Sequence, residues 1–168
     1  TFHTILADTL SDACSYEVVH AVHDQLRGLM EECRRRFRGN ERGIRLEVDV
    51  PAGLTVSGNA AALQTVFDNL VENGLRYAAS YIRMELTGEE EGGYLLTVEN
   101  DGAPIPQPTL NVLFQKFYKG ADGNFGLGLY IAKKIVQFHK GDIWASNWAD
   151  GVRFQLLLRR EDRMAGRR

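Results

Sequence analysis

The chain has 168 residues, of which 44% are hydrophobic and 25% charged, and its formal net charge is −2. This size and composition suit one well-cored domain, and the near-neutral charge argues against a general affinity for nucleic acid or anionic membrane. No apolar run is long enough to span a bilayer, and residues 1–15 lack the layout of a signal peptide. We therefore expect a cytoplasmic chain with no membrane contact by this fragment.

Helical periodicity dominates the first part of the chain. Apolar residues at helical spacing predict helices over residues 2–14 and 16–37, and Gly39 follows an arginine cluster that suits a solvated helix C-terminus. Cys14 and Cys33 have no metal-ligand or disulfide spacing, so we expect free thiols.

The middle and end of the chain alternate strands with helices. Residues 43–50 alternate apolar and charged side chains as in a half-exposed strand, which Pro51 ends. A helix over 59–78, capped by Asn59, buries an apolar face. Further expected elements are strands 81–86 and 94–100 joined by a turn, a helix over 129–139, and a hairpin of strands 142–148 and 152–160.

This order of elements predicts an α+β fold, a two-layer α/β sandwich in which helices cover one face of a mixed sheet. We expect residues 1–40 to form a helical linker and lead helix, 41–160 the main domain, and 161–168 a disordered tail.

Four glycines precede the last predicted helix in "GADGNFGLGLYIAKK" (120–134). The stretch lacks the Lys and hydroxyl of a P-loop, and its glycine spacing differs from that of a dinucleotide fingerprint. Glycines before a helix still let backbone N–H groups approach a phosphate closely. A plain flexible turn is the alternative.

A row of polar side chains lies on one face of the predicted helix 59–78. Asn69 and Asn73 are one turn apart, and Arg76 and Tyr77 follow on the same side. Such a row indicates a site, although two asparagines on a helix are more often surface residues.

Four blocks in a fixed order resemble the catalytic, ATP-binding domain of bacterial sensor histidine kinases, within the group that includes gyrase, Hsp90 and MutL. They are "NLVENGLRYA", "VENDGAPIP", "LFQKFYKG" and "GNFGLGLYIAKKIVQFHKG", which are similar to the N, G1, F and G2 boxes. The resemblance covers roughly residues 41–158. It implies the Bergerat (GHKL) fold, Mg·ATP as ligand, and γ-phosphoryl transfer to a histidine on a separate dimerisation domain, with a response regulator as an indirect partner.

The resemblance also implies roles for individual residues. Asn73 matches the magnesium-ligating asparagine, Asn69 a second polar contact, and Lys119 a basic residue after the F box; these three are the expected catalytic residues. An amide at position 69 cannot act as the general base that ATP-hydrolysing relatives carry there, which favours a kinase. The expected nucleotide-binding residues are Asn73, Arg76, Tyr77, Asn100, Gly102, Pro104, Ile105, Phe117, Tyr118, Gly123, Gly126, Leu127, Gly128 and Leu129.

Two features depart from the family pattern. The G1 box has Asn100 and Pro104 where Asp and Gly are usual. An amide oxygen still accepts from the adenine amino group, and the amide nitrogen donates to N1, whereas proline removes a backbone donor. The segment between Lys119 and Gly126, the ATP lid in the family, is short.

The phosphoacceptor is expected outside this chain. His23 is followed by an acid, but it lies too close to the N box for the family's domain order, and no other histidine has a supporting motif. Two alternatives stay open: a serine kinase of the anti-sigma type, and a degenerate module that has lost nucleotide and serves as a protein-docking surface.

Overall fold

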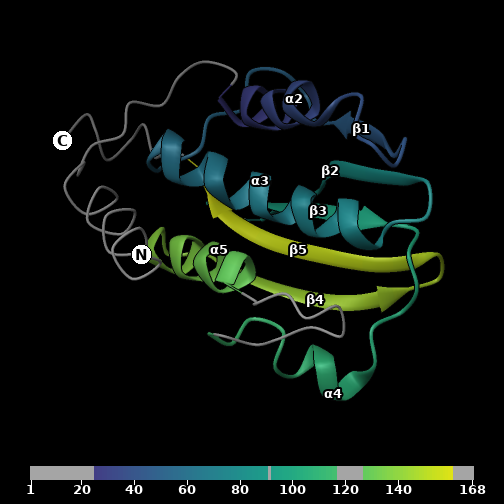
Figure 1. Cartoon of the computed structure of the whole chain (residues 1–168). Coiled ribbons are helices and arrows are strands. Elements are labelled where there is room, and N and C mark those ends of the chain that lie inside the picture. The colour runs from purple at the N-terminus through teal and green to yellow at the C-terminus, as the bar shows by residue number, and fades with distance from the viewer. Residues whose placement is uncertain (1–24, 91, 117–126, 161–168) are drawn as a thin grey trace, which may run out of the picture.

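The computed structural model describes residues 25–90, 92–116 and 127–160 of the chain (Figure 1). Four helices and five strands occur in these ranges. In chain order they are α2 (Gln25–Phe37), β1 (Arg45–Asp49), α3 (Ala60–Tyr77), β2 (Tyr81–Glu90), β3 (Gly93–Asn100), α4 (Gln107–Leu110), α5 (Leu127–Phe138), β4 (Asp142–Trp148) and β5 (Gly151–Arg159).

The five strands form one mixed sheet in the order β1-β2-β3-β5-β4. β1 runs parallel to β2, and the other three pairs are antiparallel. In the β2–β3 pair, Ile82 lies opposite Asn100. The end of β3 is therefore next to the start of β2, which directly follows α3.

The helices α2, α3 and α5 cover one face of this sheet, and α3 and α5 lie side by side (Figure 1). Because successive side chains of a strand point to opposite faces of the sheet, every second side chain enters the core between the sheet and the helices. The buried strand residues include Ile82, Met84, Leu96, Val98, Ile143, Phe154 and Leu156. Asn100 shares the face of Leu96 and Val98, so its side chain is directed toward the helices.

The predicted buried face of α3 is confirmed: Leu63, Val66, Phe67, Leu70 and Val71 are all buried. The cap is confirmed as well, because the Asn59 side chain accepts a hydrogen bond from the Ala62 N–H at 3.0 Å. The backbone N–H of Asn59 in turn donates to Nε2 of His139, at 3.0 Å, beyond the end of α5. These bonds attach the N-terminus of α3 to α5.

The α2 helix belongs to the same core. Leu26, Met30 and Cys33 are buried in one cluster with residues of α3 and of the sheet. Cys33 is a free thiol, as predicted, and donates to the Asp68 carboxylate on α3. The described part of the predicted lead segment thus packs as a helix of the main domain.

The main differences from the sequence prediction are two element boundaries and one additional helix. β2 continues to Glu90, through residues expected to form a turn, because Gly88 to Glu90 pair with β3 after a bulge. Leu127 and Gly128 are already helical, so α5 includes residues expected to precede it. The short α4 was not predicted. The predictions for residues 1–24, including Cys14, and for 161–168 lie outside the described residues.

No helix among the described residues has the length and apolar character required to cross a bilayer.

Candidate nucleotide-binding site

The polar row on α3 lies toward the C-terminal half of the helix. Asn69 and Asn73 are half-buried, whereas Arg76 is exposed and Tyr77 is 43% exposed. Since residues four apart share a helix face, the two amides lie one above the other between the core and solvent. The four polar side chains predicted to form a row on this helix are therefore all at least partly accessible to solvent.

The first turn of α5 contacts this row. The Asn69 amide nitrogen donates to the Gly128 carbonyl oxygen at 3.0 Å. A Cβ added at Gly128 would lie 3.6 Å from Cγ of Asn69, in ordinary contact. The bond orients the Asn69 amide, since its nitrogen is used and its oxygen remains as an acceptor. Leu127 and Leu129 on either side are buried, and Leu129 belongs to the core.

The end of β3 supplies a third amide. Asn100 is only 3% exposed, and its Oδ1 accepts a hydrogen bond from the Gly102 N–H at 2.8 Å. Gly102 is buried against α3: a Cβ there would overlap the Tyr77 carbonyl oxygen and lie 2.9 Å from Oδ1 of Asn100. Only glycine fits this close approach between the end of α3 and the turn that follows β3 at Asp101 and Gly102, which we call the G1 turn.

Asp101, between these two residues, was not predicted as a site residue. Its Oδ1 accepts the backbone N–H groups of Ala79, Ser80 and Tyr81 at 3.0, 2.8 and 3.1 Å, and the Ser80 hydroxyl donates to its Oδ2. Desolvation raises the pKa of the Asp101 carboxyl, but the hydrogen bonds from Ser80 and Tyr81 outweigh it and lower the pKa to about 2. The only sequence signal is an Asp-Gly pair directly after a strand.

The remaining predicted residues divide into two groups. Pro104 is exposed, and the backbone N–H and C=O of Ile105 both bond to the Asn147 side chain of β4 at 2.8 Å. This pairing holds the G1 loop against the edge of the sheet. The other group lies outside the described residues and comprises Phe117, Tyr118, Lys119, Gly123 and Gly126.

The described residues contain no cluster of three or more His, Cys, Asp or Glu side chains that could hold a metal ion on its own. Mg²⁺ prefers oxygen ligands, keeps several waters and is often bound through one or two protein groups together with substrate phosphates. The half-buried amide oxygen of Asn73 fits such a shared site. It does not fit a metal held by protein alone.

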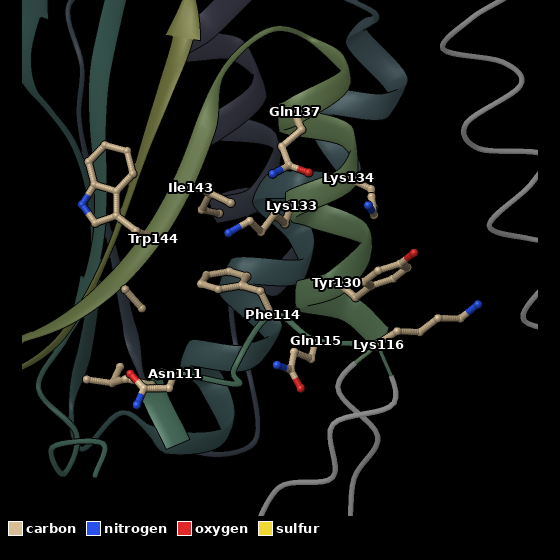
Figure 2. Close-up of a pocket in the computed structure, with 12 residues that line it drawn as sticks. Asn111, Phe114, Gln115, Lys116, Tyr130, Lys133, Lys134, Gln137, Ile143 and Trp144 are labelled. Atoms are coloured by element: carbon tan, nitrogen blue, oxygen red, sulfur yellow. The ribbon is translucent and has the colours of Figure 1, made fainter. Parts of the chain in front are cut away.

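A separate hollow of about 460 Å³ lies between α5, β4 and the segment after α4. Figure 2 shows Phe114, Lys133 and Ile143 between α5 and β4, with Tyr130 and Lys116 on the other flank of the helix. Among the described residues that line it none is acidic, whereas Lys133 lies over the Phe114 ring, and Lys116 and Lys134 lie over Tyr130. These cations already have aromatic partners, and the hollow is apart from the two site amides of α3.

Comparison with known proteins shows which family the chain belongs to. Residues 58–162 match the family described as histidine kinase-, DNA gyrase B-, and HSP90-like ATPase. The chain is 30% identical over 128 residues to the sensor histidine kinase CssS of Bacillus subtilis, covering 76% of this chain and 28% of CssS. It is 34% identical over 119 residues to the histidine-protein kinase BaeS of Escherichia coli, covering 67% of this chain and 26% of BaeS.

Solved structures have the same fold. The catalytic domain of histidine kinase ThkA, in a nucleotide-free form, superposes with a TM-score of 0.74 at 25% identity, covering 84% of this chain and 96% of that one. The mycobacterial sensor histidine kinase MprB gives a TM-score of 0.75 at 22% identity, covering 86% and 99%.

The chain therefore belongs to the family of histidine kinase-, gyrase B- and HSP90-like ATPases. Within that family it is the ATP-binding catalytic domain of a sensor histidine kinase, in the two-layer α+β fold that the sequence predicted. It spans only about a quarter of the length of relatives such as CssS and BaeS.

Proposed function

We propose that this domain binds Mg·ATP between α3, the end of β3 and the first turn of α5, and transfers the γ-phosphoryl group to a histidine on a separate dimerisation domain. The observation that carries the proposal is the placement of three amides on α3 and at the end of β3. Asn69 and Asn73 lie on one face of α3, and buried Asn100 lies on the helix-facing side of β3.

Asn100 binds the adenine base of the nucleotide in this proposal. Its amide oxygen has two lone pairs, of which the Gly102 N–H uses one. The other accepts from the adenine 6-amino group, and the amide nitrogen donates to N1. Because Asn100 is 3% exposed, water competes poorly for these bonds, and leaving them unmade is costly.

Asn73 lies at the phosphates of the nucleotide in this proposal, and its amide oxygen would ligate Mg²⁺ there. The metal supplies neutralisation of phosphate charge during transfer. Arg76 and Tyr77, exposed one turn further along α3, donate toward the phosphates, and the first turn of α5 offers backbone N–H groups at the positive end of that helix. Lys119, Phe117 and Tyr118, with Gly123 and Gly126, remain predicted contacts of the same site.

Kinase chemistry fits position 69 better than ATP hydrolysis does. An amide cannot accept a proton from water as a carboxylate can, and the Asn69 nitrogen is already bonded to Gly128. In the transfer, an imidazole nitrogen forms a bond to the γ-phosphorus, the bond to the bridging oxygen breaks, and ADP leaves.

The acceptor imidazole is expected on another domain. His139, the histidine among the described residues, has Nδ1 2.7 Å from the Ile135 carbonyl oxygen and accepts the Asn59 N–H at Nε2. Both ring nitrogens are thus in use within the fold. We place the domain in the cytoplasm, in a two-component system with the response regulator as the next acceptor.

The test combines this chain, radiolabelled ATP with Mg²⁺, and the dimerisation domain of the same kinase. We expect label on the dimerisation domain in an acid-labile, base-stable linkage, as for phosphohistidine. Asn73→Ala should abolish transfer, and the exposed α3 variant Glu72→Ala should retain it. Acid-stable label would support the anti-sigma-type serine kinase instead, and no nucleotide binding at millimolar concentration would support the degenerate docking module.

A further inference from the structure

Asn100 by itself does not determine which purine it binds. Adenine presents a donor at its 6-amino group and an acceptor at N1, whereas a 6-oxopurine presents an acceptor at O6 and a donor at N1. An asparagine amide has a donor end and an acceptor end, so a rotation that exchanges them suits the other purine. An aspartate has no such choice.

The orientation of the Asn100 amide is determined by the next residues. Oδ1 accepts the Gly102 N–H at 2.8 Å. If the Asn100 amide rotated so that its oxygen and nitrogen exchanged places, its NH₂ group would lie against the Gly102 N–H. Two hydrogen-bond donors would then face each other at a buried position. Selectivity for adenine therefore depends on keeping the Gly102 N–H in its present place.

Asp101 attaches this turn to the segment that joins α3 to β2. It accepts three consecutive backbone N–H groups, from Ala79, Ser80 and Tyr81, and the Ser80 hydroxyl. The segment begins directly after Tyr77, whose carbonyl oxygen lies against Gly102. The same carboxylate therefore positions both the Gly102 N–H and the end of the helix that carries Asn73.

We infer that Asp101 is a positioning residue that gives this site its preference for adenine over 6-oxopurine nucleotides. It acts through Gly102 on the amide orientation of Asn100 and does not touch the base. The inference rests on the proposed nucleotide function and deepens it.

A purely structural role for Asp101 makes a different prediction. If its hydrogen bonds only stabilised the turn, their loss would lower the fraction of folded protein, and the folded molecules would keep the wild-type ratio of affinities. A change in the ratio of ADP to IDP affinity separates the two roles, because both nucleotides carry the same ribose and phosphates.

The experiment measures dissociation constants for ADP and IDP in Mg²⁺ with wild type, Asp101→Asn, Ser80→Ala and Asp142→Asn. For Asp101→Asn we expect ADP binding to weaken by about tenfold, the scale of weakened bonds to a charged group, with a smaller change for IDP. Ser80→Ala keeps the three backbone bonds and should be close to wild type. Asp142 is a matched control, since its carboxylate also accepts a local backbone N–H, that of Ile143, but on β4.

An unchanged ADP to IDP ratio in folded Asp101→Asn would overturn the inference while leaving the proposed function intact. Absence of ADP binding by wild type would overturn the proposed function, and this inference with it.

A measurement on wild type covers the case in which Asp101→Asn does not fold. Coupling between sites is reciprocal, so ADP binding should slow hydrogen exchange at the amides of Ala79, Ser80 and Tyr81, and IDP should do so less. Equal protection by both nucleotides, or none by either, would contradict the role of Asp101.

Discussion

The two ends of α3 are both attached to residues distant in the sequence, but by different chemistry. At the N-terminus the attachment is uncharged: Asn59 caps the helix through Ala62, and the His139 ring bridges Asn59 and Ile135. This end joins α3 to the last turn of α5, away from the three site amides.

At the C-terminus the attachment is charged and adjoins the site. The Arg42 guanidinium donates to the Leu75 carbonyl oxygen at 2.7 Å, and the Asp101 carboxylate accepts the three N–H groups that follow the helix. Gly102 lies directly against Tyr77. The difference indicates that the N-terminal end mainly stabilises the fold, whereas the C-terminal end also positions Asn73 and Asn100.

The largest expected effect comes from separating the C-terminal end of α3 from the G1 turn. In Gly102→Ala the new Cβ meets the backbone oxygen of Tyr77, which cannot move away as a flexible side chain could. Such overpacking lowers the free energy of unfolding by about 1–3 kcal/mol. A change of that size in the free energy of binding corresponds to a loss of about tenfold to a hundredfold in ADP affinity. Titration calorimetry and urea unfolding measure the two effects.

Gly28→Ala is the matched control for Gly102→Ala. A Cβ at Gly28, in α2, meets no atom within 4 Å, so this variant should bind ADP as wild type does and be no less stable. Wild-type ADP affinity in Gly102→Ala would show that the close approach to Tyr77 is not needed for binding.

A smaller effect, on stability alone, is expected at the N-terminal end. His139→Ala leaves the Asn59 N–H without its acceptor and removes the bond to Ile135, at a cost of about 1–3 kcal/mol. His139→Gln, which offers both an acceptor and a donor, should recover part of this. The folded His139→Ala protein should bind ADP normally, and a tenfold loss of affinity there would break the proposed division between the two ends.

Removal of the cap should cost less. Asn59→Ala loses the bond to the Ala62 N–H, and N-cap substitutions of this kind cost about 1 kcal/mol. The midpoint of urea unfolding should fall accordingly with no change in ADP affinity. No change in the midpoint would mean that His139 alone holds this helix end.

The smallest expected effect is the acid response of the C-terminal end, because the Asp101 carboxylate is only half-buried and solvent screens its interactions. The Asp101 pKa is about 2 in the folded protein and 3.8 ordinarily, so the ionised carboxylate favours the folded state above pH 3.8 and this contribution is lost as the pH falls toward 2. Over that interval the stability of wild type should fall more than that of Asp101→Asn. Parallel pH profiles of the two unfolding midpoints would contradict this.

The sequence predicted the parts of the molecule that depend on local pattern. The buried face of α3 follows from helical spacing, and the Asn59 cap from residue type. The pairing of β2 beyond Leu86 was missed because "TGEE" has turn-like composition, and β3 imposes the strand through contacts such as Thr87 with Thr97.

The resemblance predicted the three amides of the proposed site but not the groups that hold them in place. Asp101 acts on backbone N–H groups, which every residue but proline carries, so no side-chain pattern marks its partners. The role of the Gly128 carbonyl as acceptor for Asn69 depends on how α3 and α5 pack, which periodicity does not specify.

The central claim is that the C-terminal half of α3 forms, with Asn100, a site for nucleotide and Mg²⁺. The most direct test is titration of wild type, Asn73→Ala and the exposed neighbour control Glu72→Ala with ADP, with and without Mg²⁺. We predict that Mg²⁺ strengthens binding by wild type and Glu72→Ala, and that Asn73→Ala folds but loses the magnesium-dependent part. An Asn73→Ala protein that binds ADP as tightly as wild type in Mg²⁺ would contradict the account.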